Sequence, residues 1–249
     1  MDTTLTPQTQ SFAAKTSEDQ FNLSFICVES SEGVFFVPKY AAHRPASQAI
    51  LNGRLYEPYT HIVIAEILRL RPGSLVHAGT FFGDMLPSFS KAASELVYAF
   101  EPVLENYLLA KLCVQENNLG NVLIQNAGLS SSITVARINT AAGNGDHLGG
   151  ASHISDSGQS TTLLTIDSLA ISNLSIIQLD VEGHELEALK GAIQTIKTHW
   201  PVIMIEDNHN NCAEFLKSLG YHLIGVIPGL RVWQSDHDNA DIKTFLESL

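Results

Sequence analysis

The chain has 249 residues, of which 45% are hydrophobic and 16% are charged, so its composition excludes a disordered chain and allows a large core. Its formal net charge of −12 repels phosphate backbones and argues against nucleic acid as a partner. The sequence contains no apolar run of membrane-spanning length, and its N-terminus lacks the basic and apolar regions of a secretion signal. Three isolated cysteines indicate free thiols in a reducing compartment, so we expect a cytoplasmic protein.

The first seventy residues predict an extension that precedes the main fold. Residues 1–20 are polar and are expected to form a flexible tail. Two apolar runs flank "SSEG" at residues 30–33 and predict a hairpin with a four-residue turn. A short helix within residues 41–60 and a second helix over residues 61–70, ended by "RPG", complete this N-terminal extension, which covers residues 21–70.

From residue 74 onward, apolar strand-like runs alternate with helical patterns, which predicts an α/β fold with a mostly parallel sheet and helices on both faces. The longest helical pattern covers residues 184–200, where apolar residues recur at intervals of three and four. No domain boundary interrupts residues 21–249, so we expect a single domain. The glycine-rich residues 139–160 are too long for an ordinary connection and predict either a mobile lid or a disordered loop.

Polar residues stand where the predicted strands end. Sheets of this kind bind ligands beyond the carboxyl ends of their strands. A sheet with only a structural role does not need a polar group at every strand end. The sequence therefore predicts a ligand crevice lined by His77, Glu101, Asn126, Asp180 and Glu206.

The stretch "SLVHAGTFFGD" carries two glycines, Gly79 and Gly83, at the predicted turn between a strand and a helix. Glycines there allow a backbone to approach a ligand closely, although an ordinary structural turn is the alternative. Asp84 at the helix start would repel a phosphate, so a cofactor without phosphate is favoured. Glu101 is placed to accept the hydroxyls of a ribose, and Asn126 either reaches an adenine edge or is an ordinary turn residue.

The segment "IIQLDVEGHELEALKGA" concentrates acids at a predicted strand-to-helix junction. Asp180, Glu182 and Glu185 surround His184 within six residues. Such a group is costly to hold unless the carboxylates are solvated, bind a cation or share protons. The alternative explanation is that a helix N-terminus is enriched in acids because the helix dipole favours them. This explains Glu185 and Glu182, but it does not explain Asp180, which ends a strand.

Several segments together carry a family resemblance. "LDVEGHELEALKGA" at residues 179–192 resembles the hallmark of the FkbM family of S-adenosylmethionine-dependent methyltransferases. Looser matches follow the family's order and make the resemblance extend over roughly residues 47–230. These matches are "NGRLYEPYT" (52–60), "AFEP" (99–102), "NAGLS" (126–130), "TIDSL" (165–169) and "IMIED" (203–207).

The resemblance implies a class I methyltransferase, with a Rossmann-like seven-stranded sheet that contains one antiparallel strand and binds S-adenosylmethionine at the end of its first strand. It assigns cofactor binding to a set of residues in the glycine turn and at the following strand ends. This set is His77, Gly79, Thr80, Phe81, Gly83, Asp84, Glu101, Pro102, Asn126, Ala127 and Asp180.

One position departs from the family's pattern. The family's glycine motif begins with an acid that helps to place the amine of the cofactor's methionine, whereas this chain has His77 there. A neutral histidine still offers a hydrogen-bond acceptor, but a charged one would repel the amine and the sulfonium. We expect a site that still binds the cofactor, with His77 in place of the acid near its amine, rather than a site that has lost cofactor binding.

The expected reaction is methylation of a hydroxyl on a saccharide or another small-molecule acceptor, because this is what the resemblance implies. An alcohol needs a base or a metal to become a nucleophile, and the candidates for catalysis are Asp180, Glu182 and His184. His184 is the natural proton acceptor near neutral pH, although a structural role at the helix start is the alternative. Asp180, Glu182 and Glu206 offer oxygen ligands for Mg²⁺, the less favoured alternative.

The rival interpretation is a binding module with a methyltransferase-like fold that holds a nucleoside or a protein without turnover. The missing acid at His77 motivates it. A nicotinamide-dependent oxidoreductase fits less well, because the glycine spacing is wrong for a pyrophosphate. The sequence leaves the identity of the acceptor and the formation of a homo-oligomer open.

Overall fold

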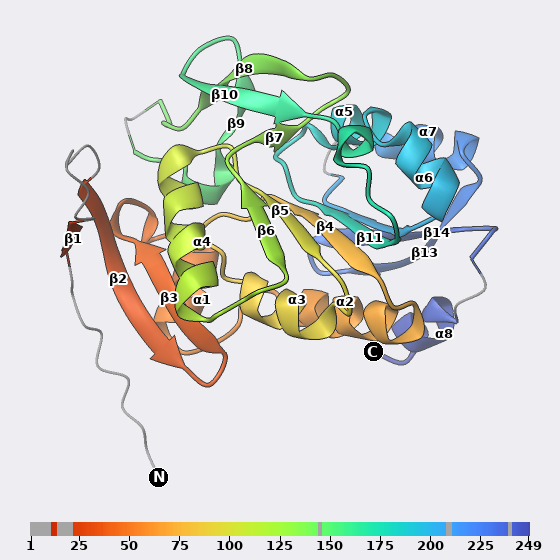
Figure 1. The fold of residues 1–249 in the computed structure, drawn as a ribbon, viewed down its shortest axis with the longest axis horizontal. Coiled ribbons are helices and arrows are strands. Elements are labelled where there is room, and N and C mark those ends of the chain that lie inside the picture. Colours follow the sequence, from red (N-terminus) through yellow and green to blue (C-terminus); the bar gives the residue numbers. More distant parts are fainter. Residues whose placement is uncertain (1–10, 14–21, 144–145, 208–210, 239–240) are drawn as a thin grey trace.

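The computed structural model describes residues 11–13, 22–143, 146–207, 211–238 and 241–249, and a seven-stranded sheet forms its centre (Figure 1). The order across this sheet is β13-β14-β12-β11-β4-β5-β6. Pairing is parallel from β12 to β6, while β14 runs against both of its neighbours, so the predicted mostly parallel sheet with one antiparallel strand is confirmed. The strands are β4 (Ser74–Ala78), β5 (Val97–Phe100), β6 (Val122–Gln125), β11 (Leu174–Leu179), β12 (Val202–Ile205), β13 (Tyr221–Ile227) and β14 (Leu230–Ser235).

Helices cover both faces of this sheet, as the alternating pattern predicts (Figure 1). One face packs against α2 (Pro58–Leu70), α3 (Leu86–Ala92) and α8 (Ile242–Glu247). The other face packs against α5 (Glu185–Lys190), α6 (Ile193–His199) and α7 (Cys212–Ser218). Because helices lie on both sides, β4, β11 and β12 are buried along their whole length, which explains why their sequences are mostly apolar. Among the described residues, no helix combines the length and hydrophobicity that crossing a membrane requires.

The register places four strand ends at one level. Ala78 pairs with Leu179 and with Phe100, and Leu179 pairs with Ile205. The residues that follow β11, β5 and β12 therefore lie side by side at the carboxyl edge of the sheet. His77 was expected to end its strand, but it lies one residue inside β4 and pairs with Gln178. At this level the chain after β4 instead carries Gly79.

The helix predicted over residues 184–200 is two helices, α5 and α6, and the prediction of one continuous helix is wrong. Gly191 separates them, and a Cβ atom there would lie 2.0 Å from the backbone oxygen of Ser130. The carboxylate of Asp167 accepts hydrogen bonds from the backbone amides of Gln194, at 3.1 Å, and Thr195, at 2.8 Å, and so caps the second helix. The apolar spacing continues through the break, which is why periodicity alone does not reveal it.

The N-terminal extension forms a separate small sheet beside α4 (Leu104–Glu116). Strands β2 (Asn22–Ser30) and β3 (Gly33–Pro38) form the predicted hairpin, but two residues connect them rather than four, because Ser30 pairs with Gly33. Of the expected tail, the structure describes β1 (Ser11–Ala13), which pairs with β2; the other residues of 1–20 lie outside the described residues. The short helix α1 (Pro45–Leu51) follows.

A four-stranded sheet lies over the carboxyl edge of the central sheet (Figure 1). Its strands are β7 (Gly128–Leu129), β8 (Thr134–Asn139), β9 (His153–Ser155) and β10 (Gln159–Leu164), in the order β7-β10-β8-β9. Much of the glycine-rich stretch 139–160 is therefore part of this sheet or of the turn before β9, while residues 144–145 lie outside the described residues. A Cβ atom on Gly149 would lie 2.8 Å from Cβ of Ala41, so this stretch rests on the N-terminal extension.

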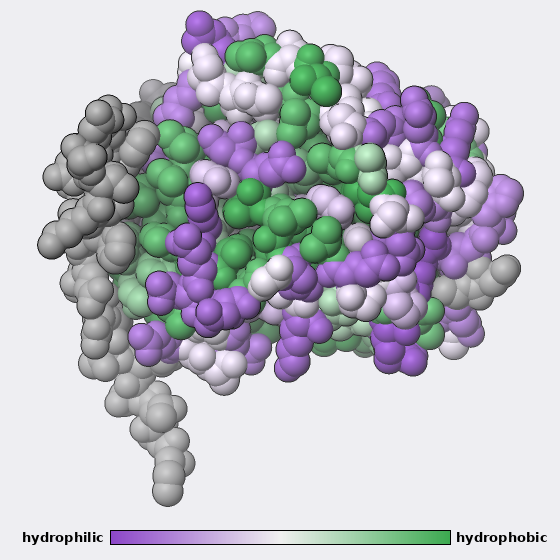
Figure 2. Space-filling model, viewed as in Figure 1, coloured by the Kyte–Doolittle hydropathy of each residue, from purple (hydrophilic) through white to green (hydrophobic). Residues whose placement is uncertain are grey.

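Hydrophobic residues also gather on part of the surface. Figure 2 shows such residues around the middle of the viewed face, with polar residues around them. The edge strand β6 lies in the middle of the same view (Figure 1), and its Leu123 is 45% exposed. This strand has a neighbour on one side only, so part of its apolar sequence stays uncovered.

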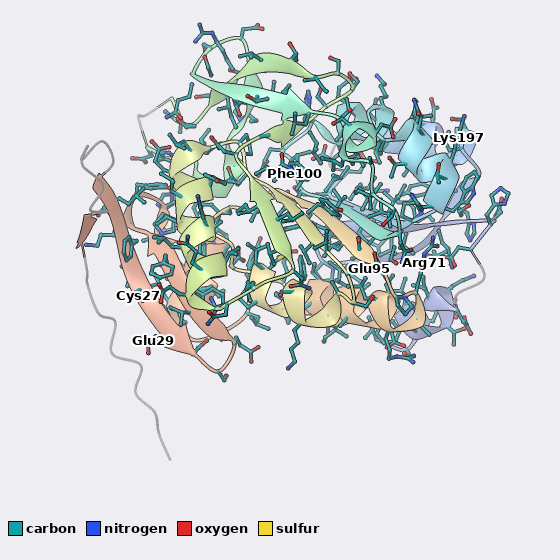
Figure 3. The ribbon with its side chains drawn as sticks, viewed as in Figure 1. Cys27, Glu29, Arg71, Glu95, Phe100 and Lys197 are labelled. Carbon is teal, nitrogen blue, oxygen red and sulfur yellow. The ribbon has the colours of Figure 1, made fainter. Side chains whose placement is uncertain are left out.

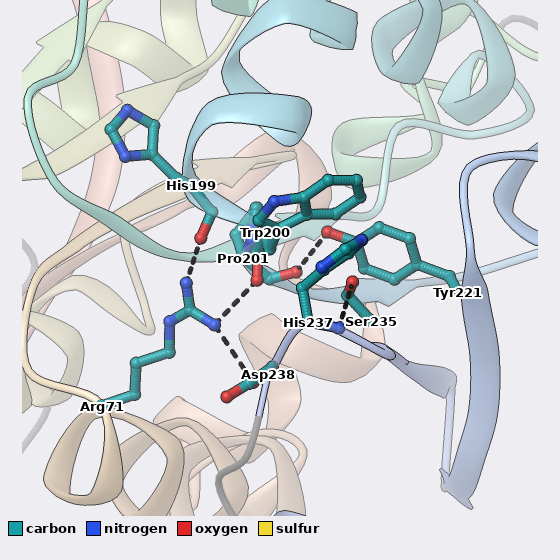
Figure 4. A network of polar contacts seen from close by, with 8 residues as sticks. All are labelled: Arg71, His199, Trp200, Pro201, Tyr221, Ser235, His237 and Asp238. Carbon is teal, nitrogen blue, oxygen red and sulfur yellow. Dashed lines mark hydrogen bonds and ion pairs between the residues drawn. The ribbon is translucent and has the colours of Figure 1, made fainter.

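Three chain segments meet at Arg71, near the edge of the central sheet where the parallel strands β4 and β12 begin (Figure 4). The guanidinium donates hydrogen bonds to the backbone oxygens of Trp200, at 2.7 Å, and His199, and it forms an ion pair with Asp238 at 3.1 Å. The two carbonyls end α6, where backbone oxygens lack partners within the helix. Arg71 therefore joins the end of α2 to the end of α6 and to the segment after β14.

We predict that Arg71→Gln lowers the free energy of unfolding by about 2 kcal/mol, because half-buried carbonyls and a carboxylate lose a charged donor. Urea denaturation of the purified variant measures this change. Arg69→Gln is the matched control, since Arg69 on the same helix is exposed and bridges Glu66 on the surface, where solvent screens the ion pair. Equal losses for the two variants would contradict the structural role of Arg71.

Candidate functional site

Two cavities adjoin at the carboxyl edge of the central sheet. The first has an empty volume of about 500 Å³ and lies between the strand ends and the four-stranded sheet. The second has an empty volume of about 640 Å³ and extends toward the N-terminal extension. The residues that line both cavities are Gly79, Gly150, Asp180 and Glu182. Phe100, which lines the first cavity, lies near the centre of the molecule in Figure 3.

The glycine turn has its shape because two chain segments cross closely. Gly79 has φ of +91°, and a Cβ atom on it would lie 1.9 Å from the backbone oxygen of Asp180. Phe81 also has a positive φ, of +49°, and its backbone amide donates a 2.8 Å hydrogen bond to Oε2 of Glu101. The predicted close approach therefore exists, but its first partner is the neighbouring strand end of the protein itself.

Glu101 is a buried carboxylate on the wall of the first cavity. It is 4% exposed and accepts hydrogen bonds from the backbone amide of Val103, at 2.9 Å, from Asn106 Nδ2, at 3.4 Å, and from Phe81. Burial raises its pKa to about 7 in spite of these donors. The carboxylate is thus held in one orientation beside Pro102, which lines the same cavity.

Asn126 and Ala127 follow β6 but do not line either cavity. The Asn126 side chain donates hydrogen bonds to the backbone oxygens of Glu101, at 2.9 Å, and Pro102, at 3.2 Å. It therefore fixes the backbone that carries Glu101. In the structure the backbone positions Gly128 and Leu129 line the cavity instead.

His77 lines the second cavity in its neutral form. Burial lowers its pKa to about 4, and its Nδ1 hydrogen-bonds to Oε1 of Gln178 on the adjacent strand. Its ring meets that of Phe89 edge-on, with 5.1 Å between the centroids. Because burial disfavours the charged imidazole, His77 is neutral near pH 7 and does not repel a cationic ligand.

Of the other residues in the glycine turn, some line the second cavity and others are buried in the protein interior. Asp84 is 6% exposed and lines the second cavity, and burial raises its pKa to about 7. Phe81 lines the same cavity. Gly83 packs against α4, where a Cβ atom would lie 3.2 Å from Cα of Ala110. Thr80 is buried, its Oγ1 has no hydrogen-bond partner, and it lines neither cavity.

Three acids meet where the two cavities join. Oxygen atoms of Asp180, Glu182 and Glu206 lie within 4.8 Å of one another. Burial and a hydrogen bond with Glu206 hold the pKa of Asp180 well above its usual range. The nearby negative charges of Glu206 and Glu182 act in the same direction. Burial also raises the pKa of Glu182, while the charge of Arg44 acts in the opposite direction.

His184 and Glu185 occupy the start of α5 with different roles. Nε2 of His184 lies 3.0 Å from Oγ of Ser130, and the side chain lines the first cavity. Burial lowers its pKa, so it is neutral near pH 7. Oε1 of Glu185 accepts hydrogen bonds from the backbone amides of Val181 and Gly183, both at 3.1 Å. Glu185 therefore stabilises the turn before the helix.

Sequence reasoning did not include several residues that line the cavities. Gln178 is a polar residue within an otherwise apolar strand, and this signal was available. Gly150 stands in the glycine-rich stretch, where its position over the crevice follows from the fold. Arg44 of the N-terminal extension lines the second cavity, and nothing in the local sequence points to it.

Comparisons with known proteins place this site in a family. The profile of the methyltransferase FkbM domain matches residues 77–247. No curated protein matches the chain. Among solved structures, the methyltransferase FkbM from Methylobacillus flagellatus KT is similar, with 18% identity and a TM-score of 0.50 over 66% of this chain and 43% of that chain. The present chain thus spans less than half of that protein.

Two further structures share lower similarity. A methyltransferase from Geobacter sulfurreducens has 17% identity and a TM-score of 0.42 over 74% of this chain and 83% of that chain. A SAM dependent methyltransferase from Aquifex aeolicus has 16% identity and a TM-score of 0.41 over 72% of this chain and 93% of that chain. The strand order described above is that of the class I methyltransferase fold. Because the FkbM domain profile covers more than half of its length, the chain belongs to the FkbM methyltransferase family.

Proposed function

We propose that the protein is an S-adenosylmethionine-dependent methyltransferase that methylates a hydroxyl of a saccharide or another small-molecule acceptor. The observation that carries the proposal is that two cavities join at Asp180 and Glu182, beside the glycine turn. The first cavity is then available for the nucleoside of the cofactor, and the second cavity for the remainder of the cofactor and for the acceptor. Family membership supports methyl transfer, and the choice of a hydroxyl rests on the family resemblance.

The residues of the first cavity fit the nucleoside part of this cofactor. Leu129, Ile138 and Leu163 supply apolar walls for a base, and the fixed carboxylate of Glu101 supplies acceptors for ribose hydroxyls. When bound, S-adenosylmethionine supplies a methyl group on a positively charged sulfur.

The acids at the junction suit a positively charged centre and a proton transfer. Carboxylates around the joined cavities favour a cation electrostatically. We assign proton acceptance from the acceptor hydroxyl to Asp180 in its ionised form, because its raised pKa makes this carboxylate a stronger base than an ordinary aspartate.

Glu182 and His184 have supporting roles in this proposal. Glu182 lines both cavities and adds negative charge at their junction. His184 is neutral and is the alternative proton acceptor, although its Nε2 already faces Ser130. The oxygen ligands of Asp180, Glu182 and Glu206 also suit Mg²⁺, which is the less favoured alternative.

A binding module without turnover is the second candidate function. The observation that favours it is the neutral His77 at the position where the family's pattern has an acid. Binding and turnover measurements separate the two candidates.

We predict that S-adenosylhomocysteine binds the wild-type protein with one-to-one stoichiometry in a calorimetric titration, whereas ATP does not bind, because its phosphates would meet acids. Glu101→Gln weakens the affinity about tenfold, since a charged acceptor for the ribose is lost. Thermal unfolding of the variant is the control for a folded protein. Absence of binding by both S-adenosylmethionine and its demethylated product would exclude the enzymatic function.

Asp180→Asn is expected to lower turnover by about 10²- to 10⁴-fold, because the amide cannot accept the proton. The measurement is formation of S-adenosylhomocysteine with a panel of saccharides and natural-product alcohols. Product binding by the variant is the control, and it should change by less than about tenfold. Unchanged turnover would remove Asp180 from the mechanism.

The buried acids also predict how stability depends on pH. Folded Glu101 and Asp84 retain protons that the unfolded chain releases, because burial raises the pKa of each to about 7. Their contribution therefore favours the folded state at low pH and is lost as the pH rises from about 4 to about 7, at roughly 3 kcal/mol for each group.

We expect the free energy of unfolding of the ligand-free protein to fall more steeply over this pH range in the wild type than in Asp84→Asn. Urea denaturation at a series of pH values measures the slope. Glu29→Gln is the control, since Glu29 lies on the outer side of the N-terminal extension (Figure 3) and is exposed. If Glu29→Gln reduced the pH dependence of the free energy of unfolding as much as Asp84→Asn does, this account would be contradicted.

A further inference from the structure

Asp84 is a buried carboxylate on the wall of the second cavity that lacks a cationic partner. It is 6% exposed, and among the described residues its hydrogen bond is with its own backbone amide. Neither an ion pair nor a side-chain donor reaches it within this part of the chain. Burying a carboxylate without compensation costs free energy, so an acid kept in this position indicates a ligand that compensates it.

The other acids of the second cavity already have partners. Asp180 forms its hydrogen bond with Glu206, and Glu182 experiences the positive charge of Arg44. The negative charge of Asp84 acts instead on Tyr56 and Cys113, two neutral side chains whose ionisation it opposes. Asp84 therefore is the acid of this cavity with capacity for an additional cation.

The arrangement of the cavities indicates which cation this is. If the nucleoside of the cofactor occupies the first cavity, its amino-acid end must extend across the shared residues Gly79 and Asp180 into the second cavity. That end carries an ammonium group. His77 on the same wall is neutral, and with Nδ1 directed to Gln178 it offers a lone pair but no charge.

We propose that Asp84 binds the α-ammonium group of the amino-acid end of S-adenosylmethionine and supplies the negative charge that His77 does not. The inference rests on the proposed function, because it needs the cofactor's nucleoside in the first cavity. Asp84 lies seven positions after His77 in the sequence, shortly before α3, and lines the same cavity as His77. An ammonium bound there gains a charge-assisted hydrogen bond inside a buried site.

The test compares two ligands that differ only in the amino-acid end. S-adenosylhomocysteine has this end, whereas 5′-methylthioadenosine keeps the nucleoside and the sulfur but lacks the ammonium group. Both are titrated calorimetrically into the full-length wild type and Asp84→Asn, at about pH 8, where Asp84 is ionised. Asparagine keeps the shape of the side chain and removes a buried charge, so the variant should unfold at the same or a higher temperature.

Asp207→Asn is the matched control variant. Asp207 is 5% exposed, carries a buried oxygen that has no hydrogen-bond partner among the described residues, and lines neither of the two joined cavities. It therefore reproduces the loss of a buried carboxylate at a place where no ammonium is expected.

We expect Asp84→Asn to weaken S-adenosylhomocysteine binding by about 10- to 100-fold and to change 5′-methylthioadenosine binding by less than about twofold. Asp207→Asn should change neither affinity. Equal losses for both ligands, or no loss for either, would overturn the proposal. Unchanged S-adenosylhomocysteine binding together with a raised KM for an amine-bearing acceptor would assign Asp84 to the acceptor instead. If the wild type binds neither ligand, the proposed function itself fails.

Discussion

The contact between Gly79 and the backbone of Asp180 is the constraint on which the site depends. Strands β4 and β11 end at the same level, and the chain leaving β4 passes so close to the chain leaving β11 that any side chain at position 79 would collide with a carbonyl group. This crossing forms the common floor of both cavities. It also brings the acid that follows β11 next to the turn, where a ligand can contact both.

Burial of charge is the second theme of the structure. Three acids at the crevice, Asp84, Glu101 and Asp180, have raised pKa values, and the main cause in each case is loss of hydration. Each is handled differently: Glu101 is held by several donors, Asp180 shares a hydrogen bond with Glu206, and Asp84 has little beyond its own backbone. Burying several acids in one place disfavours their charged forms, which is why all three pKa values are raised.

The sequence predicts the sheet well because its signals are strong. The buried strands are mostly apolar, and the turn residues between them are clear. The prediction from sequence fails where the apolar spacing continues through a break between two helices, as at Gly191. It also fails where strand pairing decides where a strand ends, as for Ser30 and Gly33 in the hairpin. Periodicity describes a helix face but does not see that the carbonyl of Ser130 occupies the space next to Gly191.

The site was predictable in part. The acids at the strand ends were identifiable because polar residues ending apolar runs are unusual. The position of His77 inside β4 and its pairing with Gln178 follow from strand register, which no single strand's sequence contains. Arg44 enters the second cavity only because the N-terminal extension folds back over the carboxyl edge, and that is a tertiary event without a local sequence signal.

The origin of the second cavity's wall has a consequence for mutations in the N-terminal extension. Arg44, Pro45, Ala46 and Tyr56 line this cavity and come before residue 77, where the matched FkbM domain begins. The extension also packs against Phe81 and Phe82 of the glycine turn. A substitution that disturbs this packing would therefore alter the cavity wall and the turn together, although it lies outside the matched domain.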